Sequence, residues 1–371
     1  MKKFTSLYIL ISCLCTHFAY SQGCVAVRHM SCSTVAPGGS SDIFKQKNGT
    51  FMVNFGYRYF ESFRHFRGDV QERERVENGT QVINVSHAAD LGITYILNPR
   101  LSFSANLPLL SNDRSSLYEH YGNSLTANPQ QLRFHTQSKG IGDMRISGSY
   151  WLFNPAKLIK GNVAIGFGIK LPTGNYGVTD GFHKRTKDGA DYTIVKPVDQ
   201  SIQLGDGGVG FSLEVQGYQT LAKKSSLYYN GFYLFNPKNV NSTDRDPTNA
   251  TVDPIIRYFS VADQFAGRVG VNQVLSSKLG LSVMLGGRIE GVPSSDLIGK
   301  SEGYRRPGYI VSAEPGLSFM KGKVSGVLSL PIALYRNRTK SYYDKQDPTG
   351  QRHGDAAFAD YSINFSLSKW F

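Results

Sequence analysis

The chain has 371 residues, a formal net charge of +13 and 12% aromatic residues. Beyond its first residues, no stretch approaches the roughly 20 apolar residues that a membrane helix needs, which excludes a helical membrane protein. The 39 glycines and the aromatic content instead favour a sheet protein whose hydrophobic residues are spread over alternate positions.

The amino terminus has the organisation of a secretory signal. Lys2 and Lys3 precede the apolar run 4–14, and the small residues Ala19 and Ser21 flank Tyr20. We therefore predict a signal peptide over residues 1–21 that is cut after Ser21. A competing interpretation takes residues 10–13 as a lipoprotein box, although the apolar core before it would be short.

Cleavage would leave Cys24 and Cys32 as the two cysteines of the mature chain. Two cysteines close together in an exported protein favour a disulfide, because the compartment is oxidising. We predict that they are bridged within a periplasmic segment of residues 22–50. The alternative is a lipidated or free Cys24.

Residues 51–371 carry a repeating strand pattern that predicts a transmembrane β-barrel. In residues 162–171, for example, Val163, Ile165, Phe167 and Ile169 alternate with small or polar residues, as expected for one lipid-facing and one lumen-facing side. Twelve such segments are predicted, near residues 51–60, 88–97, 100–107, 140–152, 162–171, 207–219, 226–235, 263–274, 278–289, 308–319, 323–334 and 358–371.

The connections between these segments alternate between short and long. Short connections such as 98–99 and 321–322 alternate with six long ones such as 61–87 and 172–206. This arrangement predicts an all-β fold, an antiparallel up-and-down barrel with short periplasmic turns and long extracellular loops. The last strand alternates toward Phe371 and resembles the terminal signal that the barrel-assembly machinery recognises, so we expect that machinery as a partner.

The inner face of the predicted barrel carries equal numbers of opposite charges. Five positive and five negative residues fall on it: Arg58, Arg145, Lys170, Arg268 and Arg288, with Asp90, Asp143, Glu214, Glu290 and Glu314. Buried charge must be paired or hydrated. These residues either form structural ion pairs that make the barrel rigid or line a path that orients a solute.

The sequence supports no cofactor, no metal ion and no catalytic residues. Residues 205–210 match the spacing of a dinucleotide-binding motif but lack the strand and helix that the motif requires. The eight histidines show no metal-ligand spacing. Ser86 and His87 are adjacent, and adjacent side chains of a strand point to opposite faces, so they cannot act together as in a hydrolase. We therefore predict that the protein is not an enzyme.

Removing the two signal lysines reduces the net charge from +13 to +11. The basic residues gather between the predicted strands, as in Arg305-Arg306, rather than on a basic helix, so nucleic acid is not expected as a partner. They either bind phosphates of outer-membrane lipopolysaccharide or are simply solvated.

Two short motifs carry a resemblance to a known family. Gly140-Ile141-Gly142-Asp143 and Lys170-Leu171-Pro172-Thr173-Gly174 resemble the outer-membrane family named for the meta-pathway of phenol degradation, most clearly over residues 101–177. The resemblance implies a barrel of a class often described as transporters of aromatic or hydrophobic solutes. It marks Gly142, Asp143, Pro172, Thr173 and Gly174, without an established binding or catalytic role for any of them.

Together these observations predict a channel in the outer membrane of a Gram-negative bacterium, for passive uptake of a small aromatic or hydrophobic molecule. Long loops such as 172–206 are expected to fold inward and narrow the lumen. The alternative is a structural or surface-interaction barrel with a closed lumen.

Overall fold

The computed structural model describes residues 48–155, 157 and 160–371. The predicted signal peptide and both cysteines, Cys24 and Cys32, lie outside the described residues. Their cleavage and pairing therefore remain predictions.

The strands have the inverted polarity of a membrane barrel, with apolar side chains exposed and polar side chains buried. In β7 (Gly161–Leu171), the side chains of Ile165 and Phe167 are 52% and 53% exposed, whereas Lys170 is 3% exposed. The same alternation continues around the sheet, for example at Phe55, Leu91 and Leu285. The predicted lipid-facing register is thus the one that the structure adopts.

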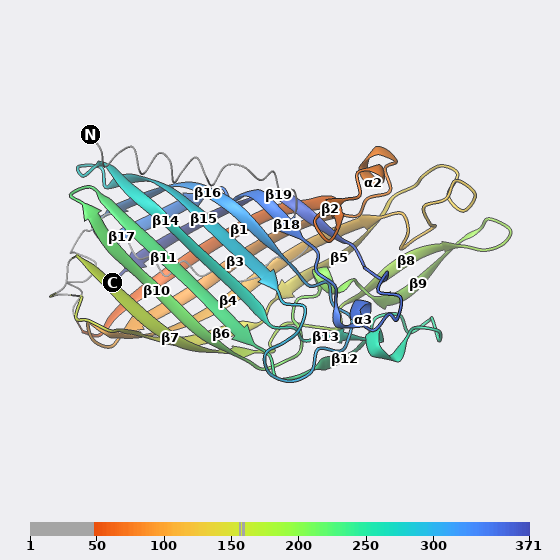
Figure 1. Cartoon of the computed structure of the whole chain (residues 1–371), viewed down its shortest axis with the longest axis horizontal. Coiled ribbons are helices and arrows are strands. Elements are labelled where there is room, and N and C mark those ends of the chain that lie inside the picture. The colour runs from red at the N-terminus through yellow and green to blue at the C-terminus, as the bar shows by residue number, and fades with distance from the viewer. Residues whose placement is uncertain (1–47, 156, 158–159) are drawn as a thin grey trace.

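Twelve antiparallel strands close into one barrel, as predicted (Figure 1). Closure is made by the last strand against the first, with Tyr57 opposite Phe365. In order around the barrel the strands are β1 (Thr50–Arg67), β3 (Ile83–Ile96), β4 (Leu101–Ser116), β5 (Phe134–Ile141) with β6 (Met144–Trp151), β7, β10 (Gly210–Ala222), β11 (Ser225–Phe235), β14 (Gln264–Ser276), β15 (Leu281–Val292), β16 (Gly308–Lys321), β17 (Val324–Ser329) with β18 (Ile332–Asn337), and β19 (Ala356–Trp370).

Two of the twelve strands are interrupted. Pro331 separates β17 from β18, because proline has no N–H for the ladder. Gly142 and Asp143 separate β5 from β6, so that β4 pairs with both segments while β7 pairs only with β6. The second interruption lies in the motif that the sequence analysis singled out.

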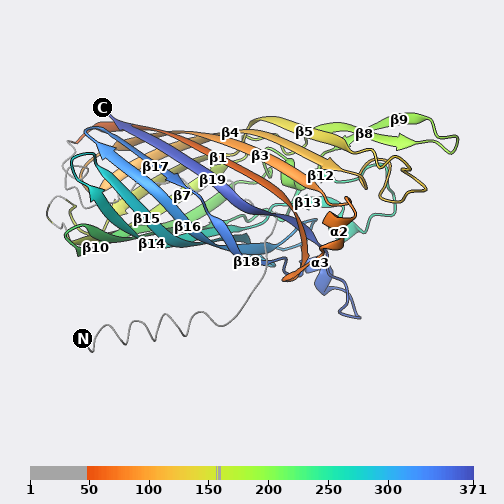
Figure 2. The ribbon, with the colours of Figure 1, turned by 90° about the horizontal axis from the view of Figure 1, so that it is seen from above.

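Short turns lie at one end of the barrel with the carboxyl terminus, and the long loops gather at the other end (Figures 1 and 2). The loops carry the remaining elements: β2 (Val70–Gln71), α2 (Glu74–Glu77), β8 (Thr179–Arg185), β9 (Asp191–Pro197), η1 (Gln200–Ile202), β12 (Val240–Asp244), η2 (Pro254–Ile256), β13 (Tyr258–Ser260) and α3 (Tyr342–Lys345). None of the helices in the described residues has the length and apolar character needed to cross a membrane.

Most strands extend further toward the long loops than their alternation predicts. β1 continues to Arg67 rather than ending near residue 60, and β4 continues to Ser116 rather than near 107. The alternation of apolar and polar residues ends before the strands do, whereas the backbone pairing between neighbouring strands continues. Basic residues expected between strands, such as Arg64 and Arg336, therefore belong to strands.

Candidate functional site

A loop between β9 and β10 lies inside the barrel. We call residues 198–209 the inward loop; it contains η1, whose first turn is capped by the Asp199 side chain. Ile202 and Gln203 are each 1% exposed. The predicted inward folding of loop 172–206 is therefore realised by its last part, while its β8–β9 hairpin extends outward (Figure 1).

Side chains of the barrel wall hold the inward loop on one side. The hydroxyl of Ser138 donates to the carbonyl of Ile202, and Asn112 Nδ2 donates to the same oxygen at 3.4 Å. Leu204 packs with Ala88 and Leu110 in a small buried apolar cluster. The loop thus has both polar and apolar anchors on β3, β4 and β5.

The interrupted wall strand holds the loop on the other side. The Asp143 carboxylate accepts the Gly174 N–H at 3.0 Å with one oxygen and the Asp206 N–H at 3.0 Å with the other. Asp206 in turn pairs with Lys170. We call Asp143, Lys170, Gly174 and Asp206 the latch.

Two motif residues, Thr173 and Gly174, fit the backbone around the interruption between β5 and β6. The Thr173 hydroxyl donates to the Gly142 carbonyl at 2.7 Å and accepts from the Met144 N–H at 2.8 Å, which replaces ladder bonds lost at the interruption. A Cβ atom on Gly174 would lie 2.6 Å from the Leu204 carbonyl oxygen, so only glycine fits there. The motif predicted from sequence therefore fixes a loop that the motif itself does not contain.

A lumen cavity of about 170 Å³ lies beside the inward loop. Its wall combines apolar side chains such as Phe60 and Leu110 with charged ones. Of the residues predicted to line the lumen, the structure places four in its wall: Arg58, Asp143, Arg145 and Lys170. Such a mixed surface can hold an apolar molecule and orient a polar group on it.

A nearly buried ion network lies further toward the short turns. Glu290 pairs with Arg58 at 2.8 Å and with Arg288 at 2.9 Å, and Glu314 lies 3.6 Å from Arg268. A smaller cavity of about 50 Å³, the periplasmic-side cavity, is lined by Arg58, Asp90, Arg268, Arg288 and Glu314. Paired in this way, the buried charges compensate one another inside the barrel.

The remaining predicted lumen residue, Glu214, lies on β10 and accepts a hydrogen bond from the Ser212 hydroxyl at 2.8 Å. Arg145 is 9% exposed and its guanidinium lies 4.9 Å from the centre of the Phe232 ring. Of the ten predicted residues, Asp143 and Lys170 thus belong to the latch, most of the others lie in or beside the ion network, and Arg145 and Glu214 have partners of their own.

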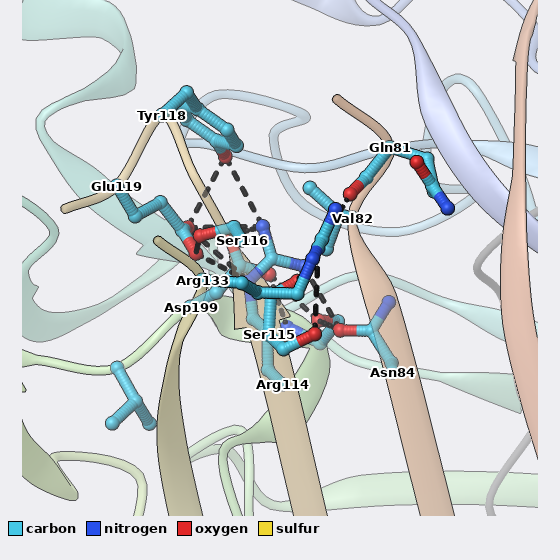
Figure 3. Close-up of polar contacts among 12 residues, drawn as sticks. Gln81, Val82, Asn84, Arg114, Ser115, Ser116, Tyr118, Glu119, Arg133 and Asp199 are labelled. Carbon is cyan, nitrogen blue, oxygen red and sulfur yellow. Dashed lines mark hydrogen bonds and ion pairs between the residues drawn. The ribbon is translucent and has the colours of Figure 1, made fainter. Parts of the chain in front are cut away.

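Sequence reasoning missed a group of contacts at the outer end of the inward loop (Figure 3). Arg114 Nε lies 2.9 Å from Glu119 and its Nη2 lies 3.7 Å from Asp199. The two terminal nitrogens of Arg306 donate to the two Asp199 oxygens, both at 2.7 Å. Asp199 lies far in sequence from both arginines, 107 residues from Arg306, and no spacing pattern relates it to them.

His65, Glu72 and Asp355 lie together and are residue types that can bind a metal ion. Their ligand atoms, however, are already engaged by other groups of the protein. His65 Nδ1 lies 2.5 Å from Asp355, and its Nε2 accepts the Val82 N–H at 2.9 Å, so both ring nitrogens are engaged. Arg75 lies 2.5 Å from Glu72 and 3.2 Å from Asp355, and its positive charge opposes a cation there.

Ser86 and His87 have separate partners, as expected for neighbours on one strand. The Ser86 hydroxyl donates to Asn112 at 2.7 Å, whereas His87 Nδ1 lies 2.8 Å from the Tyr57 hydroxyl. The pair does not form a nucleophile and its base.

Comparison with known protein families and with curated proteins finds no match. Among solved structures, an outer membrane channel from Pseudomonas putida F1 is 12% identical, with a TM-score of 0.54 over 88% of this chain and 97% of that one. The similarity is one of fold. The toluene transporter TodX of P. putida is 10% identical, with a TM-score of 0.41 over 89% of this chain and 91% of that one.

The translocator domain of the autotransporter NalP from Neisseria meningitidis is 12% identical, with a TM-score of 0.44 over 89% of this chain and 91% of that one. At these identities the solved structures show the barrel fold alone. The resemblance to the phenol meta-pathway family, which rests on Gly142, Asp143, Pro172, Thr173 and Gly174, stays a prediction.

Proposed function

We propose that this chain is an outer-membrane channel for the passive uptake of a small molecule with an apolar or aromatic part. One observation carries the proposal: the cavities form a series whose members share wall residues. Arg305 and Arg306 line both an outer cavity of about 500 Å³ and the lumen cavity. Arg58 lines both the lumen cavity and the periplasmic-side cavity.

The lumen cavity gives the proposal its chemistry. Its apolar wall residues would hold a hydrocarbon surface, while Arg58 and Arg145 would face a polar substituent. The inward loop narrows the path, and the latch determines how often it moves aside. The fold supports this proposal, because the P. putida F1 structure, which has a similar fold, is described as an outer membrane channel.

In the outer membrane of a Gram-negative bacterium, two further partners belong to the proposal. The exposed cations of the long loops would face lipopolysaccharide phosphates. The assembly machinery would recognise β19, whose exposed Tyr361 and Leu367 alternate with buried residues toward the carboxyl terminus.

The ion network favours a second candidate, a structural barrel with a closed lumen. Arg288, Glu290 and Glu314 are almost fully buried, and such a network makes a barrel rigid. This candidate predicts that no solute passes, whatever the position of the inward loop.

Swelling of proteoliposomes in solutions of small aromatic molecules and sugars separates the two candidates. A variant in which residues 200–205 are replaced by glycine and serine should admit solutes faster than the wild type. Deleting residues 186–190, the tip of the β8–β9 hairpin, serves as the control, because that tip lines none of the three cavities. If neither the wild type nor the loop variant swells, the closed barrel replaces the channel.

A further inference from the structure

The outer cavity has a wall rich in arginine. This vestibule, of about 500 Å³, lies among the long loops, and six arginines line it: Arg75, Arg114, Arg305, Arg306, Arg338 and Arg352. Among the residues that the structure describes, two carboxylates, Asp344 and Asp355, line it as well. The lining side chains therefore present mainly positive charge.

Most of these arginines are held by carboxylates outside the lining. Arg305 donates two hydrogen bonds to Asp296, and Arg306 donates two to Asp199; neither aspartate lines the vestibule. A guanidinium has five N–H donors, and a carboxylate bound in this way uses two of them. Pairing thus fixes the arginines without exhausting their donors.

Three arginines retain donors that the described part of the chain does not use. Arg305 and Arg338 are each 3% exposed, and the buried Nε of each has no acceptor among the described residues. Such buried donors are rare and costly in proteins. The guanidinium group of Arg352 pairs with no carboxylate of the described chain and donates only to the Tyr343 carbonyl, at 3.2 Å. The backbone N–H of Arg352 donates separately to the Asp347 carboxylate, at 2.8 Å.

Aromatic rings accompany the guanidinium groups. Arg352 lies 4.1 Å from the centre of the Tyr343 ring, and Arg306 lies 5.0 Å from that of Tyr304. Both tyrosines line the vestibule. A flat apolar group could pack on these rings while an attached anion contacts the arginines.

We propose that the vestibule is a binding site for a small organic anion, an aromatic carboxylate in particular, whose carboxylate is bound by Arg352 and its neighbouring arginines. This assignment rests on the proposed function, because it names the class of solute that enters the channel. The anion would then meet Arg305 and Arg306, which the vestibule shares with the lumen cavity, before Arg145 and Arg58.

Calorimetric titration of the purified full-length mature protein, in detergent free of lipopolysaccharide, tests this site. Benzoate should bind saturably, and benzyl alcohol, its neutral analogue, at least about tenfold more weakly. Arg352→Gln should weaken benzoate binding about tenfold, as expected for the loss of a charge-assisted hydrogen bond. Arg352→Lys should recover part of the affinity.

The control is Arg73→Gln, which removes the same charge from an exposed arginine on the same side of the barrel, outside the vestibule lining. It should bind benzoate like the wild type. Equal affinities for benzoate and benzyl alcohol, or equal effects of the two glutamine variants, would overturn the assignment.

Two other results would also overturn it. Binding of inorganic phosphate without binding of benzoate would assign the arginines to phosphate groups, and displacement of benzoate by purified lipopolysaccharide would assign them to the lipid. The swelling of proteoliposomes measures transport independently of binding. A protein that binds benzoate but passes no solute contradicts only the channel, and one that passes solutes without preferring benzoate contradicts only this site.

Discussion

At the scale of single residues, Asp143 joins parts of the chain that are distant in sequence. Its two oxygens accept one N–H from the loop after β7 and one from the inward loop, both at 3.0 Å. A carboxylate suits this position because it accepts at both oxygens, whereas an amide offers one acceptor and one donor. The charge of Asp143 thus holds the inward loop in its position.

Asp143→Asn should therefore loosen the inward loop. The asparagine Nδ2 would face a backbone N–H, so one charge-assisted hydrogen bond is lost, worth about 1.5–3 kcal/mol. In single-channel recordings we expect the open state to be populated on the order of tenfold more often. Asp69→Asn, at an exposed loop position, is the control. Identical recordings for the two variants would contradict the latch.

Gly174→Ala tests the close approach of the two loops. The new Cβ would lie 2.6 Å from the Leu204 carbonyl oxygen, and we expect a loss of about 1–3 kcal/mol in stability, as for other overpacked sites. Gly177→Ala is the matched control, because its nearest neighbour would be 3.6 Å away. The measurement is thermal unfolding of both variants in detergent. Equal midpoints would show that the backbone relaxes freely at Gly174.

His120 gives the outer loops a dependence on pH. Burial lowers the pKa of His120 to about 4, and its Nδ1 accepts the His183 N–H at 3.1 Å. Its ordinary pKa is about 6.5, so between these values the unfolded loop binds more protons than the folded one. Loop stability should consequently fall as the pH decreases from about 6.5 to about 4, and level off below.

Hydrogen exchange of the His183 amide measures this effect. It should accelerate on acidification, after correction for intrinsic exchange, in the wild type but not in His120→Gln, which keeps an acceptor that does not titrate. His135→Gln, at an exposed histidine, should behave like the wild type. The same pH dependence in His120→Gln would assign the effect to another group.

At the scale of elements, the sequence predicts the strands well, and it predicts that a long loop folds inward but not which residues of it do so or what they contact. Side chains that face lipid are apolar and recur at every second position of a strand. The number and order of the strands therefore follow from residues such as Ile165 and Phe167. The inward loop has no period, and its position depends on contacts such as that between Asp143 and Asp206, 63 residues apart. In the sequence, its glycines Gly205 and Gly207 stand out only because residues 205–210 match the spacing of a dinucleotide-binding motif, without the strand and helix that this motif requires.

The candidate site likewise has one part that the sequence predicts and one part that it does not. Charged residues on the inner face follow from strand register, and the structure places Arg58, Arg145 and Lys170 in the lumen cavity. The vestibule arginines lie on loops and extended strand ends, where register gives no orientation. Asp199 and Arg306, which are 107 residues apart, meet only once the barrel has closed.

At the scale of the whole molecule, the two ends of the barrel should face different compartments. Exposed Lys187 and Asn249 lie on long loops, and exposed Lys157 and Lys224 lie on short turns. Single cysteines at the first two positions should react with an impermeant maleimide on intact cells, and cysteines at the last two only after the cells are opened. The opposite pattern would invert the topology.

Solute uptake by this chain requires a path through the lumen, and the inward loop should control that path. Ala88 and Leu204 pack in the same buried cluster, on β3 and on the inward loop, and cysteines at both positions could lock the loop to the wall. Conductance of this double variant in planar bilayers, oxidised and then reduced, tests the claim, with wild type treated alike as the control. We predict that the oxidised variant is closed and that reduction restores wild-type conductance. Equal conductance in the two states of a fully cross-linked variant, or no conductance from the wild type, would contradict it.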